Sequence, residues 1–340
     1  MDTQYRGKST PTKNSELDLP KVSAIIATYN RGYVVCDAIE SILHQTYPEI
    51  EVIVVDDGST DDTQEKLKRY GNSVKVLYQR NQGPAAAWNS GISAARGSII
   101  CFLGSDDLWL PTFVSTHVSL LQRGGPKVPC SISNAMLRFT DGVEADSFKF
   151  ARLSPEGYEG LWTNPLDVLL TRFVMCGQTL AIRREALEKI GNFDPSLRYL
   201  EDYDIALRLA LEGPWCYALE PLVVYRQSAD SMSLNAPRIK DELSGYTLRI
   251  RQRIGREMKS RYPSLRSRYL ARAIRRARVD VNVARFESSQ GVLGICIARA
   301  YRVLQHYLEA FYRRTPLYPR MKVVPLAGSG HADAAPAYTD

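Results

Sequence analysis

The sequence has few cysteines and no long apolar run. No uninterrupted apolar stretch approaches the roughly 18 residues that a membrane-spanning helix needs, so we expect no integral membrane segment. The 6 cysteines are spread between Cys36 and Cys296 without a Cys-x-x-Cys pair, which argues against a zinc site and against a disulfide framework. We therefore expect reduced thiols, as in a cytosolic protein.

The 4 histidines have no spacing that would form a metal site. The first 20 residues lack the apolar segment of a secretory signal, so we expect residues 1–20 to be a polar, flexible leader. Residues 326–340 are rich in Ala, Gly and Pro, which predicts a disordered tail.

Charge is distributed unevenly along a chain of ordinary globular composition, with 24% charged and 44% hydrophobic residues. Residues 1–231 hold 23 Lys and Arg against 29 Asp and Glu, a net charge of −6. Residues 232–325 hold 21 against 6, a net charge of +15. This change predicts a first domain over 21–233 and a basic helical region over 234–325.

Apolar periodicity in the first part of the chain alternates between the periods of strands and of helices. This order predicts an α/β fold of the doubly wound class, with a mostly parallel sheet and helices on both faces. Residues 139–162, rich in Gly, Pro and acidic residues, are predicted to be a loop or an excursion near an active site and not a domain linker. The expected strands are 22–28, 51–55, 74–78, 98–103 and 177–182, and the expected helices are 33–46, 61–70, 84–95, 111–122, 184–190 and 205–211.

Acidic pairs follow two of the expected strands. Asp56 and Asp57 come after strand 51–55, and Asp106 and Asp107 come after strand 98–103. Ligands of open parallel sheets bind beyond the carboxyl ends of the strands. The first strand is not followed by a Gly-x-Gly-x-x-Gly turn for a pyrophosphate. Paired carboxylates suit a divalent cation that neutralises a diphosphate, although each pair alone could also shape a turn.

A further acidic group, Glu201-Asp202-Tyr203-Asp204, precedes the expected helix 205–211. In a structural interpretation Asp202 caps the helix and Asp204 forms a surface pair with Arg208. In a functional interpretation Asp202 is a general base, and the like charges of Glu201 and Asp204 raise its pKa.

With these motifs in place, the chain resembles the inverting nucleotide-sugar transferases of glycosyltransferase family 2, which have the GT-A fold. The resemblance to the donor-binding half of those enzymes covers residues 21–107, and it continues in the family's order for about two hundred residues in all. The matching segments are VSAIIATYNR (22–31), SILHQTYPEIEVIVVDDGSTDDT (41–63), NQGPAAAWNSGI (81–92), FLGSDDLWLP (102–111), GNFDPSLRYLEDYDIALRLALEG (191–213) and YRQSADSMS (225–233).

The resemblance implies a donor site. Ala27 and Tyr29 would border the nucleotide base, and Asp57 would accept a hydrogen bond from the imide N–H of a uracil-type base. Asp106 would bind Mn²⁺ or Mg²⁺, with Ser105 beside it. These roles agree with the chemistry of carboxylates, which accept from N–H groups and bind hard cations.

The resemblance also implies that Asp202 is the base that deprotonates the acceptor hydroxyl, which then attacks the anomeric carbon opposite the leaving diphosphate. The chain departs from many members at three positions. It has Gly104 where they have Asp, Trp88 where they have Arg, and Ser228 where they have His.

We therefore predict a metal-dependent inverting glycosyltransferase that uses a nucleotide diphosphate sugar, of UDP type. The hydroxyl acceptor would be a glycan, a lipid-linked sugar or a protein in the synthesis of cell-surface polysaccharide, glycolipid or glycoprotein glycan. Contacts to sugar and acceptor are expected within residues 131–176. The alternative is a catalytically silent, transferase-like binding protein that its basic end recruits to membranes.

The basic helical region has three interpretations. It could pack its apolar residues against the catalytic domain and expose its charge to water. It could also attract the protein to an anionic membrane surface, which would place a cytoplasmic enzyme at the inner face of the membrane. Nucleic-acid binding is the weakest interpretation, because no recognised motif accompanies the charge.

Overall fold

The structure is a computed structural model that describes residues 19–228, 240–263, 267–289, 303–304, 307, 309–310, 312–315 and 318–327. Nearly all of the expected leader, the expected domain boundary at 233 and the tail beyond 327 lie outside these residues. The prediction for 139–162 and most of the predicted elements lie within them.

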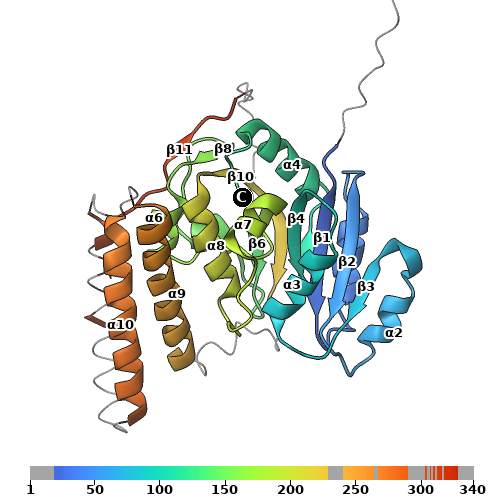
Figure 1. The fold of residues 1–340 in the computed structure, drawn as a ribbon, viewed down its shortest axis with the longest axis horizontal. Coiled ribbons are helices and arrows are strands. Elements are labelled where there is room, and N and C mark those ends of the chain that lie inside the picture. Colours follow the sequence, from blue (N-terminus) through green and yellow to red (C-terminus); the bar gives the residue numbers. More distant parts are fainter. Residues whose placement is uncertain are drawn as a thin grey trace, which may run out of the picture.

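The described strands form one mixed sheet (Figure 1). They are β1 (Val22–Thr28), β2 (Ile50–Asp56), β3 (Lys75–Tyr78), β4 (Ile99–Gly104), β5 (Leu108–Trp109), β6 (Cys130–Arg138), β7 (Glu144–Asp146), β8 (Glu159–Trp162), β9 (Leu180–Arg183), β10 (Trp215–Arg226) and β11 (Val323–Val324). Their order is β11-β8-β10-β6-β9-β4-β1-β2-β3, with β5 paired to β10 and β7 to β6. Strands β4, β1, β2 and β3 run parallel, whereas β9 lies antiparallel between β4 and β6.

Helices cover both faces of this sheet, because its central strands are apolar on both sides and need burial on both. The helices are α1 (Val35–Leu43), α2 (Thr63–Lys68), α3 (Pro84–Ala94), α4 (Phe113–Gly124), α5 (Ser147–Phe150), α6 (Pro165–Leu169), α7 (Arg184–Ile190), α8 (Glu201–Glu212), α9 (Lys240–Arg261) and α10 (Arg268–Ser289). One core cluster contains residues of α1, α2 and α4, and the other contains residues of α3, α6, α7, α8 and α9. The predicted fold class, a mostly parallel α/β sheet with helices, is confirmed.

Residues 139–162 form an excursion with structure of its own and not a plain loop, since this segment contains β7, α5 and β8. The cause is a polar contact that is distant in sequence. The amide of Asn134 on β6 donates to Asp146 at 2.7 Å, and its oxygen accepts from the Ser147 hydroxyl at 2.8 Å. Buried partners of this kind fix a strand and a short helix without any local apolar period.

The first of the basic helices, α9, packs its apolar residues against the sheet domain. Its residues Tyr246, Ile250, Ile254 and Met258 are buried in the same cluster as α8. Helix α10 lies beside α9 on its outer side (Figure 1). The packing interpretation of the basic region is confirmed for α9.

Shortening a buried side chain of α9 is therefore expected to weaken the whole domain. Ile254 is fully buried, and we expect Ile254→Ala to lower the free energy of unfolding by about 2 to 5 kcal/mol, because it leaves a cavity in the shared core. Urea denaturation followed by circular dichroism measures this. Val279→Ala on α10, where the side chain is 38% exposed, is the control and should change little. Equal effects of the two variants would contradict a shared core.

All five cysteines that the structure describes are free thiols. Cys101, Cys130, Cys176 and Cys216 are buried, and Cys36 is half-buried.

Within the described part of the chain, none of the helices combines the length and the apolar character needed to cross a membrane.

Candidate active site

A cleft of about 950 Å³ opens beyond the carboxyl ends of β1, β2 and β4. Its wall includes all the residues to which the resemblance assigns a role: Ala27, Tyr29, Asp57, Ser105, Asp106 and Asp202. The structure thus brings together residues that are up to 175 positions apart, on one edge of the sheet.

The turn after β1 places Tyr29 at the mouth of the cleft, where its side chain is 47% exposed. The next residue, Asn30, has φ 52°, a left-handed conformation that Asn tolerates better than most residues. Its backbone N–H donates to the Ser59 hydroxyl at 2.8 Å, and its side-chain oxygen accepts from the N–H of Thr60 at 2.7 Å. These bonds hold the loops after β1 and β2 together and leave the aromatic ring of Tyr29 facing the cleft.

Asp57 is buried and accepts three hydrogen bonds. Its Oδ1 accepts from the Gln79 amide at 2.7 Å and from the Gln82 N–H at 2.9 Å, and its Oδ2 accepts from the Gly83 N–H at 2.8 Å. A carboxylate offers about four acceptor positions. Asp57 therefore anchors the loop before α3 and keeps capacity for one further N–H donor from the cleft.

Asp106 and Asp107 occupy different environments. Asp107 is buried and accepts from the Gln178 amide at 2.8 Å and from the Arg226 N–H at 2.9 Å. Burial, and then the neighbouring charge of Asp106, raise the pKa of Asp107. Arg226 also donates through Nε to the Asp106 carbonyl at 2.6 Å. Asp107 thus holds the turn in place through its buried bonds, while Asp106 is half-buried at the wall of the cleft.

Gly104 bears directly on whether these residues fit a divalent cation. A Cβ at this position would lie 2.8 Å from Asp107 Oδ2 and 3.1 Å from Asp106 Oδ1. The glycine therefore leaves room beside the Asp106 carboxylate that a longer residue would fill. Among the described residues no group of three or more His, Cys, Asp or Glu could hold a metal ion. A single carboxylate still fits Mg²⁺-type binding, in which substrate phosphates and water supply the other oxygens.

Helix α8 begins with a strained residue. Leu200 occupies its N-cap position with φ 63°, which is unfavourable for a bulky side chain. Asp202 lies two residues further on and is not the N-cap, so the structural interpretation of Asp202 as a helix cap is wrong. Its Oδ1 accepts from the N–H of Tyr203 at 2.7 Å. Gly177 faces it, since a Cβ there would lie 3.6 Å from Asp202 Cβ, and the missing side chain keeps the approach open.

Asp204 does not crowd Asp202, contrary to the prediction from sequence. It is fully buried, and its Oδ2 accepts from Arg208 Nε at 2.9 Å and Nη2 at 2.8 Å. Its other oxygen contacts Arg253 of α9. The expected pair with Arg208 exists, but it is a core ion pair and not a surface one, because the period of the helix turns Asp204 away from the cleft.

The remaining pair, Glu201 and Asp202, shares the mouth of the cleft. Burial raises the pKa of both carboxyl groups, and the charge of Asp202 raises that of Glu201 further. The hydrogen bond from the Tyr203 N–H favours the charged form of Asp202. Both carboxyl groups therefore keep a proton to higher pH than free carboxyl groups do.

Several residues of the cleft were not anticipated from sequence. Phe150 and Phe173 are 62% and 54% exposed, which is unusual for phenylalanine, and both line the cleft. Both lie in the stretch 131–176, where contacts to sugar and acceptor were expected. The local sequence does not predict their exposure, because an aromatic residue in an irregular segment is normally expected to be buried in the core. Gln178, which holds Asp107, likewise has no motif.

The structure shows where the other two departures from the family pattern, Trp88 and Ser228, lie relative to the cleft. Trp88 of α3 lines the cleft and packs edge-on against Phe102, with ring centroids 5.2 Å apart. The wall here is therefore aromatic where many members have a cation. Ser228 is half-buried, and the cleft is lined by the preceding Gln227 instead.

Comparison with known proteins agrees with this geometry. Residues 23–191 match the family model described as "Glycosyl transferase family 2". The chain is 33% identical over 189 residues to "Uncharacterized glycosyltransferase RP339" of Rickettsia prowazekii, covering 55% of this chain and 57% of that protein. It thus spans a little over half the length of that relative. It is 31% identical over 223 residues to the "Putative teichuronic acid biosynthesis glycosyltransferase TuaG" of Bacillus subtilis, covering 64% of this chain and 82% of that one. The chain belongs to glycosyltransferase family 2.

Solved structures share the fold. TarS residues 1–349 of S. aureus, in complex with UDP-GlcNAc, superposes with a TM-score of 0.61 at 18% identity, covering 80% of this chain and 76% of that one. The mannosyltransferase PcManGT of Pyrobaculum calidifontis, in complex with GDP-Man and Mn²⁺, gives a TM-score of 0.52 at 21% identity, with 86% of each chain covered. At these identities the likeness concerns the fold, which is that of GT-A enzymes.

Proposed function

We propose that this protein is an inverting glycosyltransferase that moves a sugar from a nucleotide diphosphate sugar, of UDP type, to a hydroxyl acceptor. The observation that carries the proposal is the single cleft that unites Asp57, Asp106 and Asp202 at the edge of the sheet where such folds bind ligands. The complexes of TarS with UDP-GlcNAc and of PcManGT with GDP-Man support a donor of this kind. TuaG supports a product in cell-surface polysaccharide.

In the proposed reaction Asp202 accepts the proton of the acceptor hydroxyl. The hydroxyl oxygen forms a bond to the anomeric carbon of the donor sugar while the bond from that carbon to the diphosphate oxygen breaks. The nucleotide diphosphate leaves with the electron pair of that bond. Attack from the face opposite the leaving group inverts the configuration at the anomeric carbon.

The donor site would use Ala27, Tyr29 and Asp57 at the base, and Ser105 and Asp106 at the diphosphate. A divalent cation held by Asp106, when bound, would neutralise the diphosphate and favour its departure. Without such a cation, the buried Asp57 and the other carboxylates of the cleft would repel it. The Mn²⁺ in the PcManGT complex supports this dependence.

We also propose a cytoplasmic location at the inner face of the membrane. The support is the basic surface of α10, where Arg272, Arg275 and Arg278 are exposed. Each exposed basic residue near an anionic surface contributes about 1 kcal/mol. The acceptor would then be presented at that surface.

The proposal is tested against its alternative, a silent binding protein, by a screen of UDP-, GDP- and dTDP-sugars with Mn²⁺. Isothermal calorimetry reports donor binding, and release of the nucleotide diphosphate reports transfer or hydrolysis. Binding with release supports the enzyme. Binding without release under every donor supports the silent protein, and failure to bind any donor contradicts both.

The acid limb of the pH profile should depend on Glu201. Because a base acts only when deprotonated and its pKa is raised, turnover should fall as the pH drops through the pKa of the Glu201 and Asp202 pair. Glu201→Gln removes one of the two coupled carboxyl groups, so the limb should move to lower pH. Turnover at saturating donor between pH 5 and 9 measures this. The exposed substitution Glu188→Gln is the control, and an unmoved limb in Glu201→Gln would contradict the coupling.

A further inference from the structure

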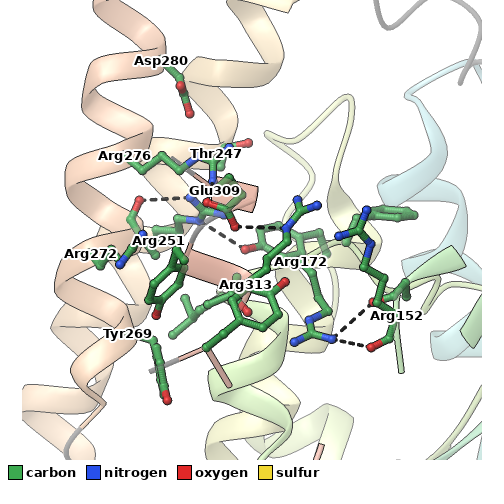
Figure 2. A pocket seen from close by; sticks show the side chains of 18 of the residues that line it. Arg152, Arg172, Thr247, Arg251, Tyr269, Arg272, Arg276, Asp280, Glu309 and Arg313 are labelled. Carbon is green, nitrogen blue, oxygen red and sulfur yellow. Dashed lines mark hydrogen bonds and ion pairs between the residues drawn. The ribbon is translucent and has the colours of Figure 1, made fainter. Parts of the chain in front are cut away.

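A second pocket of about 460 Å³ lies between the catalytic domain and helices α9 and α10 (Figure 2). Its lining is dominated by arginine. Six guanidinium groups face two carboxylates, Asp280 and Glu309. The arginines are Arg152, Arg172, Arg251, Arg272, Arg276 and Arg313.

The contacts within the pocket leave positive charge in excess. Glu309 is shared, since it accepts from Arg276 at 2.6 Å and lies 3.6 Å from Arg313. Arg172 bonds to backbone carbonyls, including that of Arg152 at 2.6 Å, and these neutralise no charge. Arg251 likewise donates to the Ala273 carbonyl at 3.0 Å. Guanidinium groups held by neutral acceptors remain available to an anion.

One buried atom of the pocket lacks an acceptor. The Nε atom of Arg172 is buried and has no hydrogen-bond partner among the described residues, whereas Arg313 Nε faces Glu309. A buried N–H without an acceptor is costly, so such groups usually belong to a site completed by a ligand or by water. Because the pocket carries excess positive charge, an anion would bind there more favourably than a neutral ligand.

The pocket adjoins the active-site cleft. Phe150, Ala151, Phe173 and Leu200 line both cavities. Arg251 also donates through Nε to the Tyr203 hydroxyl at 3.2 Å, and Tyr203 follows Asp202 directly. The two exposed phenylalanines therefore lie on a wall shared by the arginine pocket and the cleft that contains Asp202.

We propose that this pocket binds a phosphate or diphosphate group carried by the acceptor, and that Phe150 and Phe173 contact the sugar between that group and Asp202. The role as acceptor site rests on the proposed transferase function, whereas the anion site itself does not. Arginine is suited to phosphate because its planar fork donates two parallel hydrogen bonds. The acceptor would be either a lipid-anchored phosphate ester or a soluble phosphorylated glycan, and both present the same group to the arginines.

The test uses the full chain with inorganic pyrophosphate in a metal-free, low-salt buffer, measured by isothermal calorimetry. The variant is Arg152→Asn with Arg272→Gln. Asparagine is chosen because residue 152 has φ 56°, which Asn tolerates. Removing two guanidinium groups from the site should weaken pyrophosphate binding by about tenfold or more. The control is Arg275→Gln with Arg278→Gln, which makes the same charge change on the exposed side of α10 outside the pocket and should change binding by less than about twofold.

Two further measurements separate the possible outcomes. Asp106→Ala should keep pyrophosphate binding, which distinguishes this pocket from the donor site. Farnesyl diphosphate should bind more tightly than pyrophosphate if the acceptor is lipid-anchored, and with similar affinity if it is soluble. The proposal is overturned if the native chain does not bind pyrophosphate, or if the control variant, Arg275→Gln with Arg278→Gln, loses as much affinity as the pocket variant. Failure of the proposed function would instead appear as absent donor binding with pyrophosphate binding intact.

Discussion

Replacing Asp202 with asparagine is expected to lower turnover by a factor of about 10² or more, with little change in donor affinity or melting temperature. Asparagine keeps the size of the side chain and an oxygen that can accept from the Tyr203 N–H, but it cannot take the acceptor proton. Because Leu200 and not Asp202 is the N-cap of α8, the helix should not depend on this carboxylate. Steady-state kinetics with the donor found by the screen, together with thermal denaturation, measure both quantities.

Asp62→Asn serves as a matched control. Its side chain is 52% exposed beside α2, and it is not part of the cleft wall. The control should retain nearly full activity. A large loss of stability in Asp202→Asn, with activity per folded molecule preserved, would show that the residue acts in folding and would contradict its role as the base.

Removing the Asp106 carboxylate should abolish metal-dependent donor binding. In Asp106→Ala the cation would lose its protein ligand, and the donor diphosphate would then enter a cleft lined by carboxylates without compensation. We expect the affinity for the nucleotide sugar in the presence of Mn²⁺ to fall by about tenfold or more. Isothermal calorimetry with and without Mn²⁺ measures the difference.

Asp62→Ala is the control for this variant, because it removes a carboxylate outside the cleft. Its Mn²⁺-dependent affinity should equal that of the unmodified chain. If Asp106→Ala binds the donor with the same Mn²⁺ dependence as the unmodified chain, the metal assignment is wrong. The buried Asp107 is unsuitable as a control, since its bonds to Gln178 and Arg226 hold the turn in place.

The first four strands and their helices were predictable because each is a local apolar pattern. Strand β1 has the expected bounds, and β2, β3 and β4 differ from the expected ranges by one residue. Strands β6 and β10 were not predicted. In β10 the pairing with β6 shifts register around Pro221, a residue that reads as a strand breaker in a linear pattern. Pairing with β6, which is distant in sequence, keeps β10 in the sheet, although its residues lack a local strand pattern.

The strand-end carboxylates of the cleft could be predicted because they lie in recognisable motifs. The exposed phenylalanines and the guanidinium groups could not, because their role depends on the residues that surround them in space. The orientation of Asp204 shows the same limit. Three acidic residues in one short segment looked like a single cluster, yet the turn of α8 directs Asp202 to the cleft and Asp204 into the core, where Arg208 and Arg253 contact it.

The ion pair between Asp204 and Arg253 limits how this chain can be recombined with its relatives. Asp204 belongs to α8, whereas Arg253, one of its two partners, belongs to α9. A chimera that joins this catalytic domain to a foreign C-terminal segment would strip a buried carboxylate of one cation, and uncompensated buried charge is strongly destabilising. Exchange of acceptor specificity between family members is therefore better attempted with a crossover after α9 than with one before it.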